Sequence, residues 1–327
     1  SFVVRVEDTD VQRSKKEYVD SILDSLAWLN LTPDEPLVYQ MSRSEDHRKA
    51  IDTLLEKGLA YPCFCEPKDV EERLEGFKKG SIEKYSGACR NKAYTPEDLR
   101  NPHAIRFKLP SDVTAVSFDD EIRGTVTVEL EQLDDFVIMR RDGTPTYNFC
   151  VVVDDIFMKI SHVIRGEDHL SNTPKQLLIY KALGEDPPRF AHLPLILGAS
   201  GGKLSKRDAA VSVIEYKSQG FLPDALFNYL VRLGWAHRDQ ELFSKEEMIE
   251  QFSLDHVGKK GSVFDTKKLL WLNGVYIRNL KLKSFLDAVS GLGNDKLKEL
   301  TSVWNEGTLG QLFELYKERA TTVRELV

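Results

Sequence analysis

A glycine-rich loop followed by basic residues is the strongest candidate for chemistry in this sequence. Residues 198–207 read Gly-Ala-Ser-Gly-Gly-Lys-Leu-Ser-Lys-Arg. The glycines let the backbone approach a ligand closely. Lys203, Lys206 and Arg207 bring three cations within one turn around Ser205, which suits a polyphosphate leaving group whose oxygens gain charge. The Gly-x-x-x-x-Gly-Lys-Ser/Thr spacing of a Walker loop is absent, and a solvated basic turn is the alternative.

A cysteine cluster is the second candidate. Cys63, Cys65, Tyr85 and Cys89 form the pattern Cys-x-Cys…Tyr-x-x-x-Cys. The first ten residues show neither a basic nor a long apolar stretch, so we expect no secretion signal, and a metal is then favoured over a disulfide. Structural Zn²⁺ takes four ligands, mostly Cys or His. A zinc site and a metal-free group of reduced thiols both remain open.

The composition limits the class of protein. The chain has 327 residues, of which 41% are hydrophobic and 30% charged, and this excludes wholesale disorder. No apolar run approaches the roughly 20 residues that span a bilayer, so we expect a soluble, cytoplasmic protein with no membrane partner. The net charge of −7 belongs to one segment, because residues 112–135 hold eight acidic residues against Arg123 alone. It therefore does not count against an RNA partner.

A basic segment lies further along the chain. Residues 257–290 carry seven lysines and arginines against two aspartates. Such patches contact RNA phosphates and position the nucleic acid without specifying its sequence. A solvated helical face is the alternative.

Helical and extended patterns alternate in two parts of the chain, which predicts an α/β fold. The expected strands are residues 2–6, 59–61, 146–153 and 162–165, with Cys150 as a core residue of the third. The expected helices are residues 15–29 with Ser14 as N-cap, 44–56 and 173–183.

Residues 62–145 differ in character from the chain around them. They contain a charged helical pattern near residues 67–79, and then alternating patterns typical of strands. These strands are expected at residues 103–109, 113–118, 124–130 and 136–140. The segment is therefore predicted to be a mainly β insertion, whereas the signals from Leu222 onward are mostly helical.

Several blocks, in order, resemble the bacterial glutamyl-tRNA synthetases, which are class I aminoacyl-tRNA synthetases. Residues 5–10, Arg-Val-Glu-Asp-Thr-Asp, are similar to the family's Arg-Ile-Glu-Asp-Thr-Asp block, and Lys-Leu-Ser-Lys-Arg is similar to its Lys-Met-Ser-Lys-Ser loop. The other blocks that resemble the family are residues 147–149, 151–155, 162–170, 171–174 and 269–277. The resemblance extends from residue 2 to about residue 316.

This resemblance implies a two-step reaction. L-Glutamate and ATP, with Mg²⁺, give glutamyl-adenylate and pyrophosphate, and the glutamyl group then passes to the 3′-terminal ribose of tRNA(Glu). The implied fold is a Rossmann-type α/β catalytic domain with a mixed, mainly β insertion, followed by an all-helical stem-contact region and part of an anticodon-binding region. The family also implies a cytoplasmic monomer.

The family's domain order implies a division of this chain into five parts. Two parts form the catalytic domain, one is an insertion that binds the acceptor arm, and two are helical. Their expected bounds are residues 1–61 (catalytic), 62–145 (insertion), 146–208 (catalytic), 209–290 (stem contact) and 291–327 (start of the anticodon-binding domain).

Site residues follow from the same resemblance. Glu7 is expected to pair with the substrate ammonium, and Arg165 with the side-chain carboxylate, since arginine grips a carboxylate bidentately and loses that pairing with a neutral amide. For Arg165 the alternative is a structural salt bridge. The remaining expected residues are Tyr147 and Asn148 in the same pocket, Asp10, Glu167 and His169 toward ATP or the tRNA 3′ end, the catalytic Lys203, Ser205, Lys206 and Arg207, and Tyr85 as fourth zinc ligand.

One family feature is missing, and other assignments compete. The family's His-x-Gly-His block lies upstream of Arg5 and does not occur in this sequence, so we expect a chain that lacks the start of its first nucleotide-binding unit and catalyses poorly as it stands. A glutaminyl-tRNA synthetase usually carries Arg-Phe-Asp-Asp-Thr-Asn at residues 5–10. A glutamyl-queuosine tRNA(Asp) synthetase lacks the region that holds residues 271–277. A non-catalytic tRNA-binding paralogue is the third alternative.

Overall fold

The computed structural model describes residues 2–9, 14–65, 85–204 and 212–327. The chain divides into two compact units. The first unit consists mainly of residues 3–15 and 35–192, and the second mainly of residues 16–34 and 193–327. Each unit has its own core and is described separately below.

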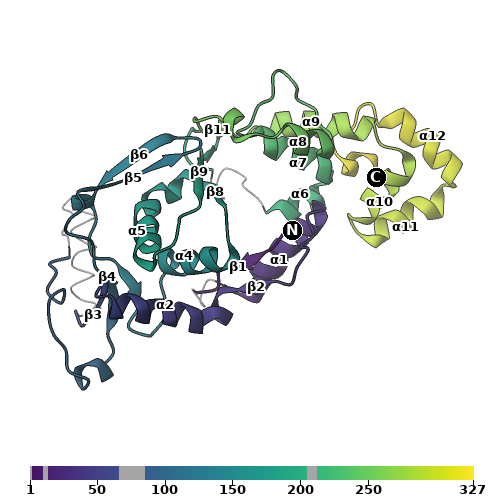
Figure 1. The fold of residues 1–327 in the computed structure, drawn as a ribbon. Helices are drawn as coiled ribbons and strands as arrows, with labels where there is room; N and C mark the ends of the chain where they lie inside the picture. Colours follow the sequence, from purple (N-terminus) through teal and green to yellow (C-terminus); the bar gives the residue numbers. More distant parts are fainter. Residues whose placement is uncertain (1, 10–13, 66–84, 205–211) are drawn as a thin grey trace. The chain divides into compact units, whose positions relative to one another are not determined.

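Three small sheets occur in the described part of the first unit (Figure 1). Strand β1 (Arg5–Val6) pairs in parallel with β2 (Val38–Tyr39). The second sheet is antiparallel and contains β3 (Ala60–Cys63), β4 (Ala104–Phe107) and β7 (Val137–Met139). The third has the order β6-β5-β9-β8, with bounds Gly124–Glu129, Ala115–Asp120, Arg189–Leu193 and His162–Gly166. Strand β5 is antiparallel to β6 and parallel to β9.

Three helices of the first unit pack against one another around a common core. They are α2 (Ser44–Glu56), α4 (Tyr147–Met158) and α5 (Thr173–Leu183). The bounds of α2 and α5 agree with those predicted, and the strands predicted at residues 103–140 all occur, each within a few residues. The helix predicted near residues 67–79 lies outside the described residues.

Three local predictions were wrong. Residues 146–153 lie at the start of helix α4, so Cys150 is a buried helical residue and not a strand residue. Residues 149–155 of α4 are all buried, and a short, fully buried apolar run does not reveal its period. Helix α1 begins at Lys16, two residues beyond Ser14, so Ser14 is not its N-cap. Strand β1 covers Arg5–Val6 and not the whole run from residue 2.

The described part of the second unit is mostly helical. Strands β10 (Ile196–Leu197) and β11 (Ser262–Val263) pair in parallel. The helices are α1 (Lys16–Trp28), α6 (Val213–Gln219), α7 (Pro223–Arg232), α8 (Lys245–Gln251), α9 (Thr266–Arg278), α10 (Leu282–Ser290), α11 (Asn294–Val303) and α12 (Glu306–Tyr316). Among the described residues, no helix is both long and apolar enough to cross a lipid bilayer.

Short 3₁₀ turns join several of these elements in both units. Two of them, η1 and η4, carry residues of the candidate site, and η7 lies near the end of the chain. Their bounds are Gln40–Arg43 (η1), Asp98–Arg100 (η2), Leu130–Gln132 (η3), Glu167–Asn172 (η4), Leu254–His256 (η6) and Val323–Leu326 (η7).

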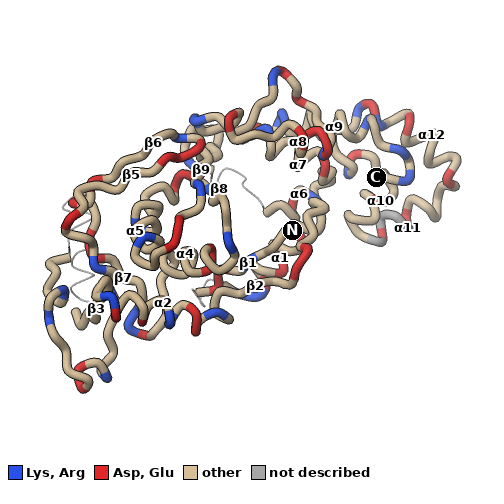
Figure 2. The backbone as a smooth tube through the Cα atoms, in the orientation of Figure 1, with Lys and Arg blue, Asp and Glu red and all other residues tan. Residues whose placement is uncertain are grey.

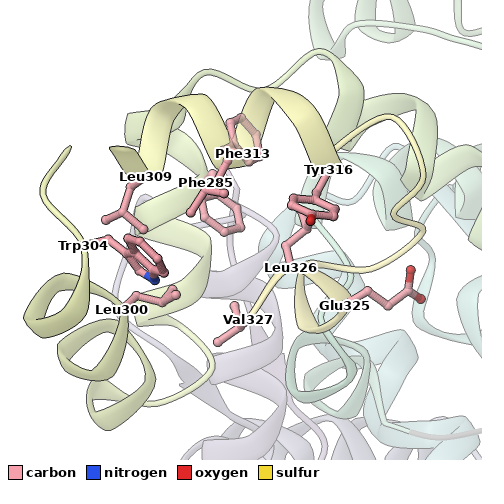
Figure 3. A pocket seen from close by; sticks show the side chains of 10 residues that line it. Phe285, Leu300, Trp304, Leu309, Phe313, Tyr316, Glu325, Leu326 and Val327 are labelled. Carbon is pink, nitrogen blue, oxygen red and sulfur yellow. The ribbon is translucent and has the colours of Figure 1, made fainter. Parts of the chain in front are cut away.

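Helices α10, α11 and α12 surround a pocket of about 310 Å³ with the last residues of the chain (Figure 3). Its lining is apolar and aromatic, and the rings of Phe285 and Phe313 stack at 4.5 Å. The one charged side chain in the lining, Glu325, already accepts hydrogen bonds from the backbone and hydroxyl of Thr321. None of the predicted site residues lines this pocket, and we assign it no chemistry.

Candidate functional site

Arg165 lies in β8, and neutral groups hold its guanidinium. Its Nη2 donates to Thr173 Oγ1 and to Gln176 Oε1, both at 2.8 Å. Its Nε donates to His192 Nε2 at 3.1 Å. Among the described residues, no carboxylate lies within 4.0 Å of the guanidinium. Within the described part of the chain, Arg165 therefore forms no structural salt bridge, which was the alternative to a substrate-binding role.

The surroundings of Arg165 include the other expected pocket residues. Burial lowers the pKa of Arg165, while the Tyr147 hydroxyl and the charges of Asp155 and Glu7 oppose the shift. Burial also raises the pKa of Tyr147, and the charge of Glu7 adds to that shift. Glu7, Tyr147 and Arg165 thus interact electrostatically within the first unit, although Glu7 is 140 residues before Tyr147 in the sequence.

An ion pair connects β1 to helix α4. Arg5 donates from Nη1 to Asp155 Oδ1 at 2.7 Å, and its Nη2 lies 3.4 Å from Glu7 Oε1. Burial raises the pKa of Asp155, although the charge of Arg5 acts in the opposite direction. The side chain of Glu7 remains 39% exposed, so its carboxylate is accessible to solvent as well as to Arg5.

A second buried carboxylate, Asp154, fixes the segment after β2. It accepts hydrogen bonds from Gln40 Nε2 at 2.8 Å and Arg43 Nε at 2.8 Å, and lies 2.9 Å from His47 Nε2. Burial alone would raise the pKa of Asp154, but these partners lower it. Asp154 therefore anchors η1 and α2 to α4.

The remaining predicted pocket residues also have partners. Asn148 Oδ1 accepts from Gln176 Nε2 at 3.0 Å, so Gln176 connects Asn148 to Arg165. The ring of His169 lies 5.7 Å from the ring of Tyr147. Glu167 forms an ion pair with Arg123. The structure thus brings Asn148 and His169 beside the Tyr147–Arg165 pair and places Glu167 in a separate ion pair.

Sequence reasoning missed two residues next to Arg165. His192 lies on β9 and Asp120 at the end of β5, and both side chains are fully buried. His192 Nδ1 lies 2.5 Å from Asp120 Oδ2. His192 is a single histidine in an apolar strand, and Asp120 lies between Asp119 and Glu121 in the acidic segment, so the sequence gave no signal that distinguished either residue.

The donor atoms of the cysteine cluster are spaced closely enough to bind one tetrahedral metal ion. The sulfurs of Cys63, Cys65 and Cys89 all lie within 4.8 Å of one another. The Tyr85 hydroxyl oxygen lies 3.5 Å from the Cys63 sulfur and 3.9 Å from the Cys65 sulfur. Ligands of a tetrahedral zinc with Zn–S bonds of about 2.3 Å are about 3.8 Å apart, so three thiols and the phenol fit the ion.

The thiols of the cluster differ in acidity, since hydrogen bonds lower the pKa of Cys89 to about 6 although burial alone would raise it. Burial and the neighbouring thiols of Cys63 and Cys89 raise the pKa of Cys65 to about 11, because several thiolates in one place repel one another. Arg106 Nε lies 3.2 Å from the Cys63 sulfur and its guanidinium lies over the Tyr85 ring. A divalent ion would displace the thiol protons, and Arg106 would offset the remaining negative charge.

The basic loop is described only at its start. Gly198 donates its backbone N–H to Gly202 at 2.8 Å, and Lys203 forms a bridge to Leu197, so residues 198–203 make a tight turn. Gly201, at φ +81°, adopts the left-handed conformation that this turn requires. Ser205, Lys206, Arg207 and Asp10 lie outside the described residues.

The predicted basic segment lies at the surface of the second unit, where Figure 2 colours its lysines and arginines blue. Six of its seven cations are exposed and Arg278 is half-buried. Lys268 forms an ion pair with Glu241 at 2.9 Å. The exposed residues are Lys259, Lys260, Lys267, Lys268, Lys281 and Lys283.

Comparison with known proteins gives consistent results. A family model described as class I tRNA synthetases (E and Q), catalytic domain, matches residues 1–271. The chain is 50% identical over 280 residues to glutamate–tRNA ligase of Pelobacter propionicus, covering 85% of this chain and 59% of that protein. It is 48% identical over 330 aligned residues to the ligase of Nitratidesulfovibrio vulgaris, covering 99% of this chain and 69% of the relative.

Solved structures agree with these matches. A crystal structure of a glutamate tRNA ligase from Elizabethkingia meningosepticum, in complex with its amino acid, superposes with a TM-score of 0.87 at 33% identity, and covers 99% of this chain and 72% of that one. The predicted fold class, that of a class I synthetase, is thereby confirmed. On the family match, the sequence identity and the shared fold, this chain belongs to the class I tRNA synthetases for glutamate and glutamine.

Proposed function

We propose that the protein is a glutamate–tRNA ligase. It would activate L-glutamate with ATP to glutamyl-adenylate, releasing pyrophosphate, and transfer the glutamyl group to the 3′ end of tRNA(Glu). The named relatives of high identity support this assignment. Because the chain spans only 59% of the Pelobacter protein, the activity is proposed for the full-length protein.

One observation carries the assignment: Arg165 is a part-buried cation whose described hydrogen-bond partners are all neutral. Its charge is therefore available to a ligand carboxylate. Glutamate would supply that carboxylate through its side chain, while its ammonium would pair with Glu7. A glutamine side chain presents a neutral amide and leaves the buried charge uncompensated, which makes the site selective.

The other predicted residues keep their roles in the proposal. Tyr147 and Asn148 would line the pocket, and Asp10, Glu167 and His169 would face ATP or the tRNA end. Lys203, Ser205, Lys206 and Arg207 would hold the departing pyrophosphate. Mg²⁺, bound with ATP, would supply further neutralisation of the phosphates.

A structural zinc site is the second part of the proposal. Cys63, Cys65 and Cys89 would hold the ion as thiolates and Tyr85 would be the fourth ligand. The spacing of the four donor atoms supports this, and Arg106 would donate a hydrogen bond to the Cys63 thiolate. The ion would join β3 to the segment around Cys89 and so stabilise the insertion.

The tRNA partner, location and organisation complete the proposal. The exposed lysines of residues 257–290 would contact phosphates of the tRNA. The assignment also includes the five-part domain division given above, a cytoplasmic location and a monomeric state. The competing glutamyl-queuosine synthetase would form a different product on the tRNA, and the non-catalytic paralogue would form none.

The decisive experiment is amino-acid activation by the full-length protein. ATP–pyrophosphate exchange should depend on glutamate and not on glutamine, and it should be measured with and without tRNA. Transfer of labelled glutamate to the 3′ end of tRNA(Glu), and not to tRNA(Asp), would exclude the queuosine-modifying alternative. If neither glutamate nor glutamine supports exchange, with or without tRNA, the protein would be the non-catalytic paralogue.

A further inference from the structure

The hydrogen bonds around His192 determine which ring nitrogen carries its proton. Arg165 Nε is a donor in every protonation state, so the nitrogen that it contacts, His192 Nε2 at 3.1 Å, must accept. Asp120 Oδ2 lies 2.5 Å from the other nitrogen, Nδ1. An ionised carboxylate accepts, so Nδ1 must donate. The geometry is that of a neutral imidazole with its proton on Nδ1.

The carboxylate of Asp120 is itself fixed. Its Oδ1 accepts three backbone N–H groups, from Ile122 at 3.0 Å, Arg123 at 2.8 Å and His192 at 3.2 Å. Only Oδ2 remains for the imidazole. Asp120 therefore cannot rotate without breaking three hydrogen bonds, and it holds His192 in one tautomer.

The charges around His192 agree with this neutral form. Burial lowers the pKa of His192, and the positive charges of Arg165 and Arg123 act in the same direction, against the opposing effect of Asp120. Backbone hydrogen bonds and the His192 ring lower the pKa of Asp120, although burial alone would raise it. The rings of Phe118 and Phe190 pack beside the imidazole and bring no charge.

We propose that His192, held by Asp120 with its proton on Nδ1, is a positioning residue that fixes the Arg165 guanidinium for a substrate carboxylate. This inference rests on the proposed function, in which Arg165 binds the glutamate side chain. Because His192 Nε2 accepts from Arg165 Nε, it orients the plane of the guanidinium without neutralising its charge. A carboxylate at the position of His192 would hold Arg165 equally well but would cancel the charge that the substrate needs.

Two amide variants of His192 distinguish the role of its Nε2 from the role of its Nδ1. In His192→Gln the amide oxygen reaches the position of Nε2 and can still accept from Arg165. In His192→Asn the shorter side chain ends near the position of Nδ1, so it can contact Asp120 but leaves the Nε of Arg165 without its acceptor. Both variants replace the imidazole ring by an amide, so both lose the packing of the ring, and this loss does not explain a difference between them.

A third variant, Asp120→Asn, inverts the tautomer. Oδ1 must still accept three backbone N–H groups, so the new NH₂ falls where Oδ2 was and donates to Nδ1. The imidazole proton is then forced onto Nε2, where it opposes the N–H of Arg165. The exposed His162→Asn is the matched control, since it makes the same substitution on β8 away from this network.

The KM for glutamate, the KM for ATP and the thermal midpoint should be measured for each variant of the full-length protein. We expect His192→Asn and Asp120→Asn to raise the glutamate KM about 10- to 100-fold, the value of a hydrogen bond to a charged group, with little change in the ATP KM. His192→Gln should stay within about fivefold of the wild type, and His162→Asn should match it. Equal glutamate KM values for folded His192→Asn and His192→Gln would overturn the proposal.

A spectroscopic measurement tests the inference without activity. Long-range ¹H–¹⁵N correlation spectra of the unmodified protein with labelled histidine should show His192 protonated on Nδ1 at neutral pH, and on Nε2 in Asp120→Asn. A wild-type Nε2–H tautomer would refute the positioning role even if the enzyme activates glutamate. Conversely, the expected tautomer without glutamate activation would leave the network intact and count against the proposed function.

Discussion

Arg5 and Asp155 are 150 residues apart in the sequence, yet their side chains meet at 2.7 Å. The pair connects the strand that ends before Glu7 to the helix that begins with Tyr147. Both side chains are largely buried, so breaking the pair would leave an uncompensated charge. This contact explains how two sequence blocks separated by the whole β insertion contribute to one electrostatic site.

The charge of Arg165 should determine glutamate activation. Arg165→Gln is expected to reduce glutamate-dependent pyrophosphate exchange by about 100-fold or more, because a charge-assisted contact with the substrate carboxylate is lost. Arg100→Gln, an exposed surface substitution in the same unit, should leave exchange unchanged. Normal glutamate activation by folded Arg165→Gln would contradict the site assignment.

Metal content tests the cysteine cluster. Elemental analysis of freshly prepared protein should find about one zinc per chain, and Cys89→Ser should lose it. Cys150→Ala, which removes a thiol outside the cluster, should keep the metal. Because the pKa of Cys65 is raised to about 11, protons compete with the ion, and zinc affinity should fall as the pH falls from 8 to 6. Full zinc retention by Cys89→Ser would refute the site.

The exposed lysines of the second unit should contribute to tRNA affinity. Lys267→Ala and Lys283→Ala should each weaken tRNA binding to a similar degree for all tRNA sequences, since phosphate contacts carry no sequence information. Each should also reduce the slope of log K against log salt by about one. Lys49→Ala, exposed on α2, is the control. An unchanged salt dependence in a variant that combines Lys267→Ala and Lys283→Ala would favour the solvated-face alternative.

Gly220 should be intolerant of a side chain. It has φ +88°, and a Cβ there would lie 2.8 Å from the backbone nitrogen of Arg324. Gly220→Ala should therefore lower the free energy of unfolding by more than the roughly 1 kcal/mol of left-handed strain. Gly184→Ala, at φ +85° with no atom within 4 Å, should cost that strain alone. Equal losses in urea unfolding would show that the contact with Arg324 is unimportant.

His192 should make stability sensitive to acid. The folded pKa of His192 is lowered from its ordinary value of 6.5, so below pH 6.5 the unfolded chain binds a proton that the folded chain does not. The free energy of unfolding should therefore fall as the pH decreases from 7 to 5, by at most about 1.4 kcal/mol per pH unit from this group. Urea unfolding of His192→Gln should show a shallower pH dependence, and an identical one would argue against a buried neutral histidine.

Periodicity and cap signals predicted part of the fold well. Helices α2 and α5 have the predicted bounds because local signals mark their ends, such as Gly58 after α2 and Pro174 at the start of α5. The start of α4 was misread because residues 149–155 are buried on every side, which removes the alternation that separates helix from strand. Strand β2, with two residues, was too short to leave a pattern.

The sequence by itself determined the family and the candidate ligand groups, because motifs such as Lys-Leu-Ser-Lys-Arg and the block around Arg165 are local in the chain. Tertiary structure decided how Arg165 is held. Its partner His192 and the aspartate behind it, Asp120, are 72 residues apart and belong to strands that pair only after folding. Whether a buried histidine donates or accepts depends on which groups face its two nitrogens, and no local pattern of residues encodes that.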